Sequence, residues 1–90
     1  MYWVYILYSA STDTYYKGQT NNLQQRIVRH NNGLEKYTKK GVPWILIYSI
    51  SCNERSEALT LERKLKNLSR KRLLDFIENH SANSAGPDLH

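Results

Sequence analysis

The sequence predicts a small α/β domain of the α+β type, a three-stranded sheet with helices packed on it. Three short runs rich in aromatic and β-branched residues have the length of strands, and three other segments repeat apolar residues at helical spacing. Their order along the chain is strand, strand, helix, strand, helix, helix. Ninety residues suffice for one domain with a modest hydrophobic core.

A β-hairpin is expected at the amino end. The run from Tyr2 to Tyr8 is dense in aromatic and β-branched residues, which favours a strand. Residues 9–14 are mainly Ser, Thr and Asp, which are typical of turns. The segment from Tyr15 to Thr20 then completes the hairpin.

Alternation along these strands brings two tyrosines to one side. Successive side chains of a strand point to opposite faces, so Tyr5 shares a face with Trp3 and Leu7. In the second strand Tyr16 shares a face with Gly18. Tyr5 and Tyr16 can therefore project from the same side of the hairpin.

The first helix is predicted from about Asn22 to Asn31, with Asn21 as its N-cap. Leu23 and Ile27 are four residues apart and form its buried stripe. The following Gly33 can adopt the left-handed conformation that ends a helix.

A basic loop over residues 34–43 precedes a third strand from Trp44 to Ile50. Asn53 is the expected N-cap of a second helix, and Ser69 that of a third. The apolar stripes of these helices are Ala58, Leu61, Leu65 and Leu68 in the second and Leu73, Phe76 and Ile77 in the third. The folded domain is expected to span residues 1–80, and residues 81–90 are expected to be a disordered tail.

The balance of charge favours an anionic partner. The formal net charge is +5, and nucleic acid is the commonest partner of basic domains. An incidentally basic, soluble surface is the alternative. The basic side chains gather in two clusters, one of Lys36, Lys39 and Lys40 and one of Arg63, Lys64, Lys66, Arg70, Lys71 and Arg72.

Other compositional features exclude several classes of protein. Cys52 is the only cysteine, so no disulfide can form within the chain, in keeping with a reducing cytoplasm. No apolar run approaches the roughly 20 residues of a membrane span. A membrane partner is therefore not expected.

Arg26 follows Gly18 by eight residues, and His30 follows Arg26 by four, so that both project from one side of the first helix. Together with Trp3-Val4-Tyr5, Tyr15-Tyr16-Lys17-Gly18 and Glu62, this set resembles the GIY-YIG nuclease superfamily, most closely its small stand-alone bacterial branch. The resemblance covers roughly residues 2–78. In three positions the motifs depart from the family pattern: Trp3 and Val4 in the first, and Lys17 in the second.

The resemblance implies a catalytic set of Tyr5, Tyr16, Arg26 and His30, with Glu62 holding one Mg²⁺ or Mn²⁺ ion. One tyrosine would activate the attacking water, and Arg26 would grip phosphate oxygens. His30 would orient a tyrosine hydroxyl or contact phosphate. These five residues are then expected to converge on one shallow face that solvent can reach.

Each assignment has a plain structural alternative. The tyrosines can be strand aromatics that pack a core, and His30 can be a helix-surface histidine. Glu62 can simply form a salt bridge with Lys66 four residues later.

The function predicted is that of a divalent-metal-dependent endonuclease that hydrolyses phosphodiester bonds in DNA, with a role in repair or recombination on damaged or branched structures. It would need no organic cofactor and show no strong sequence preference, since Lys and Arg read only the phosphate backbone. The residues expected at the nucleic acid are Gly18, Lys39, Lys40, Arg63, Lys66, Arg70 and Lys71. Two alternatives remain: a non-catalytic nucleic-acid-binding module, and a protein-interaction domain.

Overall fold

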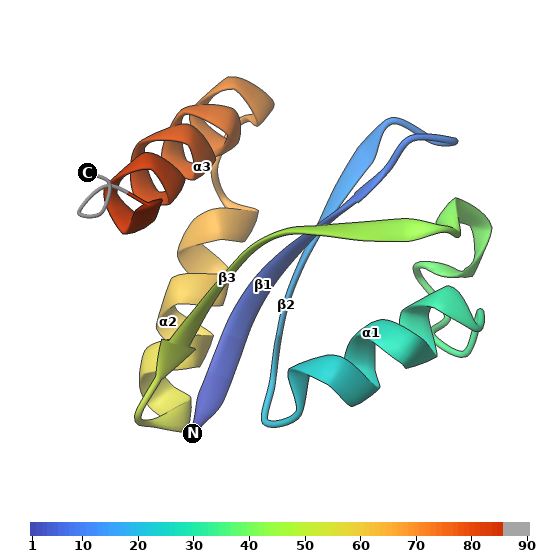
Figure 1. Ribbon diagram of the computed structural model, residues 1–90, viewed down its shortest axis with the longest axis horizontal. Coiled ribbons are helices and arrows are strands. Elements are labelled where there is room, and N and C mark those ends of the chain that lie inside the picture. Colours follow the sequence, from blue (N-terminus) through green and yellow to red (C-terminus); the bar gives the residue numbers. More distant parts are fainter. Residues whose placement is uncertain (86–90) are drawn as a thin grey trace.

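The computed structural model describes residues 1–85, and its elements follow the predicted order. The α+β architecture expected from the sequence is confirmed (Figure 1). The elements are β1 (Tyr2–Ser9), β2 (Thr14–Thr20), α1 (Leu23–Asn31), a short 3₁₀ turn η1 (Lys39–Gly41), β3 (Trp44–Cys52), α2 (Arg55–Lys66) and α3 (Arg70–Ala85).

The three strands form an antiparallel sheet in the order β2-β1-β3. The central strand β1 pairs Tyr5 with Gly18 of β2, so the first tyrosine of interest lies directly opposite the glycine. On its other edge β1 pairs with β3, and the register shifts between Ile6 and Leu7.

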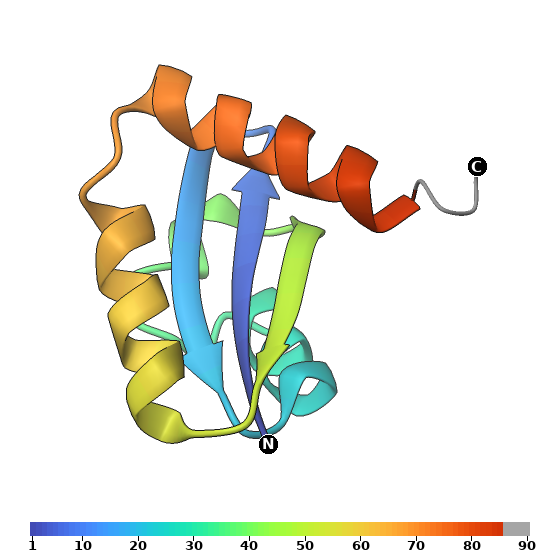
Figure 2. The ribbon, with the colours of Figure 1, turned by 90° about the vertical axis from the view of Figure 1, so that its left-hand side faces the viewer.

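Each face of the sheet has its own core. Helix α1 covers one face, and α2 and α3 lie on the other side of the sheet (Figure 1). Figure 2 shows α2 running alongside β2 while α3 crosses the strands near one end. Because side chains alternate along β1, Val4 and Ile6 pack with α2 and α3, whereas Tyr5 and Leu7 pack toward α1. The predicted stripes are confirmed, since Leu65 and Leu73 are buried in the first core and Leu23 and Ile27 pack against the second.

The structure corrects two of the three predicted helix starts. Asn22, not Asn21, caps α1: its side-chain oxygen accepts the backbone N–H of Gln25 at 3.1 Å. The reason lies two residues before Asn22, where the Thr20 hydroxyl accepts the N–H of Asn22 and holds it in an extended conformation.

The second helix begins at a capping box rather than at Asn53. Glu54 is the N-cap, and its backbone N–H is bound by the Glu57 side chain at 3.0 Å. The reciprocal bond satisfies two helix-end donors, whereas an asparagine cap would satisfy one. Ser69 caps α3 as predicted, since its hydroxyl accepts the N–H of Arg72.

The carboxyl ends of α1 and α3 test the predicted left-handed glycine and the predicted end of the folded domain. Gly33 has φ of +71°, which confirms the left-handed end of α1. Helix α3 continues to Ala85, beyond the boundary at residue 80 expected for the folded domain. The rest of the expected tail, residues 86–90, lies outside the described residues, and the domain boundary stays a prediction. Within residues 1–85 no helix is long and apolar enough to cross a membrane.

Candidate active site

A buried chain of hydrogen bonds links β1, α1 and the loop before β3. The Tyr5 hydroxyl lies 3.0 Å from Nε2 of His30, and Nδ1 of the same ring lies 2.7 Å from the Thr38 hydroxyl. Tyr5 is fully buried, and His30 and Thr38 are each 1% exposed. His30 is thus a core residue, and the helix-surface alternative for it is wrong.

Burial decides the protonation state of this chain. Desolvation lowers the pKa of His30, so the ring is neutral at pH 7 and has one N–H donor and one acceptor nitrogen. Burial likewise raises the pKa of Tyr5, and the neighbouring Tyr16 adds to this. Tyr5 is therefore a neutral phenol in the free protein, held in place by His30.

Thr38 was missed by the sequence analysis, because a threonine in a basic loop carries no distinguishing signal. Its position is set by Trp44, whose indole N–H donates to the Thr38 carbonyl at 2.7 Å. The Asn31 amide in turn holds the Trp44 backbone through two hydrogen bonds, at 2.6 and 3.2 Å. The end of α1 and the start of β3 therefore fix the loop residue that orients His30.

Gly18 provides the space for the Tyr5 hydroxyl. A Cβ atom built on Gly18 would lie 2.6 Å from that oxygen and 3.0 Å from the Tyr16 ring. The first distance is too short for real atoms, and the second is tighter than most contacts of a Cβ atom. Gly18 is itself buried, so the structure places it beneath the two tyrosines rather than on the nucleic-acid surface expected for it.

Tyr16 is the tyrosine of the pair that reaches solvent. It is half-buried, and its ring lies 6.2 Å from that of Tyr5 and 5.0 Å from that of His30. Burial raises its pKa, Lys66 and Arg26 act to lower it, and Glu62 and Glu35 act to raise it. Charged groups from α1, α2 and the loop thus all surround this hydroxyl.

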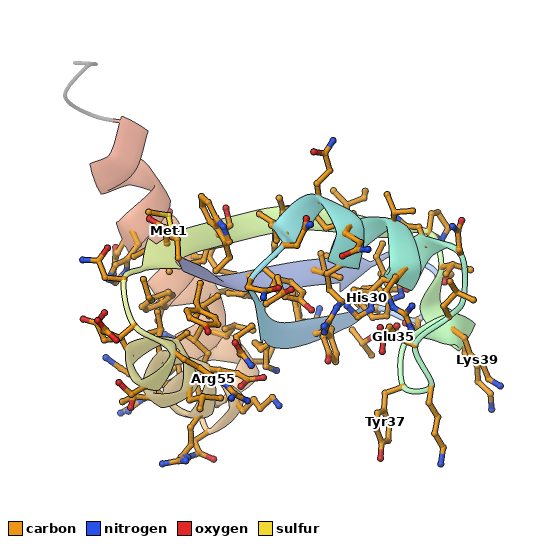
Figure 3. All side chains as sticks on the ribbon, turned by 90° about the horizontal axis from the view of Figure 1, so that it is seen from below. Met1, His30, Glu35, Tyr37, Lys39 and Arg55 are labelled. Carbon is orange, nitrogen blue, oxygen red and sulfur yellow. The ribbon has the colours of Figure 1, made fainter. Side chains whose placement is uncertain are left out.

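Arg26 lies at the partly exposed edge of the site, beside Glu35, an acidic residue that the sequence analysis missed. Its side chain is about one-third exposed, and its Nε is 3.9 Å from a carboxylate oxygen of Glu35. The same oxygen accepts the Nε–H of Arg29 at 2.8 Å, which is the chief cause of the lowered pKa of Glu35. Figure 3 shows His30 and Glu35 close together, with Tyr37 and Lys39 pointing away from them. Glu35 is the sole acidic residue between Asp13 and Glu54, a signal that could have found it.

Glu62 approaches Tyr16 from α2. Its side chain is 17% exposed, and its carboxylate lies 3.1 Å from the Lys66 ammonium, so the predicted salt bridge exists. Within the described part of the chain no three His, Cys, Asp or Glu side chains gather as a metal site. A metal would therefore depend on Glu62 with water and phosphate oxygens, which suits Mg²⁺, an ion that keeps several waters and often takes one carboxylate.

The predicted catalytic residues are thus brought together, although not in the arrangement expected. Tyr5, Tyr16 and His30 form one cluster, Arg26 adjoins it from α1, and Glu62 faces Tyr16 from α2. The expectation that all five lie on a solvent-reachable face is wrong for Tyr5 and His30. Neutral polar groups can be buried when each finds a partner, and these two satisfy one another.

The predicted basic surface divides between the two sides of the sheet. Lys39 and Lys40 are exposed on η1 in the loop after α1, whereas Arg63 is exposed on α2. Arg70 binds Asp13 at 2.7 Å and lies over the Tyr15 ring, which ties α3 to the hairpin turn. Lys71 pairs with Asp75. The two basic clusters therefore belong to elements that lie on different sides of the sheet (Figure 1).

Comparison with known proteins identifies relatives of this chain. Residues 1–75 match the family described as the GIY-YIG catalytic domain. Over 78 residues the chain is 37% identical to a UPF0213 protein of Staphylococcus haemolyticus, covering 86% of this chain and 94% of the relative. It is 39% identical over 82 residues to one of Clostridium perfringens, covering 90% and 87%.

A solved structure is also similar. The solution NMR structure of a UPF0213 protein from Bacillus halodurans matches with a TM-score of 0.58 and 30% identity, covering 87% of this chain and 84% of that one. The chain belongs to the GIY-YIG family of the nuclease superfamily, within the small UPF0213 proteins. Nucleases of this family generally use divalent metal ions.

The close approach of Gly18 to Tyr5 can be tested by a double-mutant cycle. Gly18→Ala should destabilise the fold by about 1–3 kcal/mol, because overpacking forces Tyr5 out of place. In a Tyr5→Phe background the same substitution should cost less, since the atom nearest to the new methyl group is gone. Urea unfolding of the four proteins measures both costs, and equal costs in the two backgrounds would contradict the predicted contact.

Proposed function

We propose that this protein is a divalent-metal-dependent endonuclease that hydrolyses phosphodiester bonds in DNA. One observation carries the proposal: the solvent-reaching hydroxyl of Tyr16 lies within the electrostatic reach of Arg26 on one side and of Glu62 and Lys66 on the other. Groups that could activate a water, bind a phosphate and hold a metal thus lie close together.

Arg26 is the residue proposed to bind the scissile phosphate. Its guanidinium is charged at any working pH and can donate two hydrogen bonds to phosphate oxygens. It would stabilise the extra negative charge that develops in the transition state. A phosphate that binds there has to compete with the Glu35 carboxylate, which now occupies the space beside Arg26.

Tyr16 is the residue proposed to take the proton of the attacking water. Its exposure distinguishes it from Tyr5, which no solvent reaches. The hydrogen-bonded chain of Tyr5, His30 and Thr38 lies behind the Tyr16 ring and holds its packing partners in one geometry. Tyr5 and His30 are therefore positioning residues in this proposal.

Glu62 is the residue proposed to hold Mg²⁺ or Mn²⁺. When bound, such an ion supplies positive charge that polarises the phosphate and stabilises the leaving oxygen. Glu62 has to exchange its bond with Lys66 for this, and the released ammonium remains beside Tyr16, where it favours the phenolate.

The proposed substrate is DNA without strong sequence preference, because the exposed basic residues suit contacts to the phosphate backbone. Damaged or branched DNA in repair or recombination, in the cytoplasm, is the proposed setting. A non-catalytic DNA-binding module is the second candidate, favoured by the raised pKa of both tyrosines and by the Glu62–Lys66 pair.

Cleavage of supercoiled plasmid distinguishes the two candidates. Wild-type protein should nick the plasmid with Mg²⁺ or Mn²⁺ and not with EDTA. Arg26→Ala should lose about a hundred- to a thousandfold in rate, the usual cost of removing a group that stabilises transition-state charge. Glu62→Gln should fail at low metal concentration and recover in part as the metal concentration rises.

The matched control is Arg72→Ala, which removes an exposed arginine on α3. It should cleave as fast as wild type. Equal activity of wild type and Arg26→Ala would mean that the cleavage comes from a contaminant, and binding without cleavage would leave the DNA-binding module as the function.

The proton transfer can be tested by its pH dependence. Burial raises the pKa of Tyr16, so the phenolate fraction is small at pH 7 and rises tenfold with each pH unit below that pKa. The rate of the cleavage step should therefore increase by roughly tenfold per unit between about pH 7 and pH 9. Tyr16→Phe should be slow and much less dependent on pH, with an unchanged melting temperature. The same slope in both proteins would remove Tyr16 from the role of base.

Because Glu35 and a bound phosphate would compete for Arg26, removing the Glu35 charge should raise the affinity for DNA. Glu35→Gln should tighten DNA binding by about two- to fivefold, because exposed ion pairs contribute about 0.2–1 kcal/mol. Fluorescence anisotropy in EDTA measures the affinity. Glu78→Gln, which makes the same charge change on the exposed surface of α3, is the control. An equal gain in both variants would show an effect of net charge alone.

A further inference from the structure

A polar hollow of about 230 Å³ adjoins the proposed active site at the carboxyl end of β2. Arg26 belongs to both, since it lines the hollow and also lies beside Tyr5. The lining residues are Tyr2, Gln19, Thr20, Asn21, Arg26 and Arg55. None of them is acidic, so the hollow presents two guanidinium groups among neutral side chains.

Helix α2 connects the hollow with the metal-binding position. Arg55, Glu62 and Lys66 are spaced by seven and four residues, which puts them on one face of the helix. The carboxyl end of this face lies near Tyr16, and its amino end lies beside Gln19 and Thr20. Because α2 runs alongside β2 (Figure 2), the face follows the strand from near Tyr16 to its carboxyl end.

The charge of Arg55 is not neutralised by an ion pair within the described residues. Arg29 binds Glu35 and Arg70 binds Asp13, whereas among the described residues Arg55 is in no ion pair or side-chain hydrogen bond. It is also exposed, at the first position of α2, where a positive charge is unfavourable for the helix dipole. A charge placed against the helix dipole and without a partner is available for an external anion.

We propose that this hollow is a second phosphate subsite, in which Arg55 binds a phosphodiester of the substrate strand a few nucleotides from the scissile one, which Arg26 binds. The proposal rests on the endonuclease function proposed above. Seven helical residues span about 10 Å, and a DNA strand advances 3.4 Å per nucleotide along its axis. The second phosphate therefore lies within about three nucleotides of the scissile bond. Binding of an unrelated free anion is the alternative.

Two substitutions on α2 test the subsite. Arg55→Ala removes the charge in the hollow, and Lys64→Ala removes an exposed charge on the opposite face of the same helix, with Arg55→Lys as the conservative variant. The affinity for a short fluorescein-labelled duplex is measured in EDTA by anisotropy over a range of salt concentrations. Cleavage is measured separately with Mg²⁺, and thermal melting controls for folding.

Arg55→Ala should weaken binding by about three- to tenfold and lower the slope of log K against log salt by about 0.9, the value for one lost phosphate contact. KM should rise with little change in kcat, because Arg55 is removed from the reacting atoms. Arg55→Lys should restore the slope, and Lys64→Ala should keep it. The melting temperature of Arg55→Ala should not fall, given the unfavourable placement of this charge.

Different results would exclude the subsite and the proposed endonuclease function. If wild type binds and cleaves DNA but Arg55→Ala keeps the wild-type slope, or shifts it no more than Lys64→Ala does, the subsite is excluded and the endonuclease stands. A fall in kcat at constant KM would likewise exclude it, since Arg55 would then act on the chemistry. If wild type neither binds nor cleaves DNA, the proposed function fails and the subsite with it.

Discussion

The hydrogen bond between the Tyr5 hydroxyl and His30 is the interaction on which the rest of the site depends. Both groups are out of contact with solvent, and an unpaired buried polar group costs about 1–3 kcal/mol. The bond therefore stabilises the fold only if both partners are held at the right separation. Gly18 leaves room for the hydroxyl, and Thr38 satisfies the far side of the imidazole. Trp44 and Asn31 fix the loop that carries Thr38.

This arrangement makes the proposed active site part of a hydrophobic core. Tyr5, Leu7 and Trp44 form the core on the α1 side of the sheet, with Tyr16 packed against it. The residues that set the geometry are thus rigid for the same reason that any core is rigid, namely close packing. Among the predicted catalytic residues on this side of the sheet, Tyr16 and Arg26 extend toward solvent while Tyr5 and His30 do not, which separates groups that position from groups that can touch a substrate.

The side of the site formed by α2 is more exposed than the side formed by β1 and α1. Glu62, Lys66 and Arg55 lie on the partly exposed face of α2, where side chains can exchange partners at low cost. Arg55 has no ion pair within the part of the chain that the structure describes. Glu35 plays a similar part on the other side of Arg26. In the free protein internal carboxylates and ammonium groups occupy positions that a phosphate and a metal would take. Arg26 and Glu62 are thus each paired in the free protein, and under the proposed function substrate binding would exchange these ion pairs for new ones.

The sequence by itself determined the order of the elements and the two faces of the hairpin, because strand alternation and helical spacing are local properties of the chain. The family was indicated by the resemblance of its motifs. It also placed Tyr5 and Tyr16 on one side and Ser69 at the start of α3. It could not show whether Asn21 or Asn22 is the N-cap of α1, because only the hydrogen bond from the Asn22 N–H to the Thr20 hydroxyl distinguishes the two. Tertiary structure alone decided that Tyr5 and His30 are buried while Tyr16 is not. The same is true of Thr38, Glu35 and Arg55. The loop folds Thr38 and Glu35 back onto α1, and Arg55 meets the distant end of β2, and the periodicity of single elements does not encode such contacts.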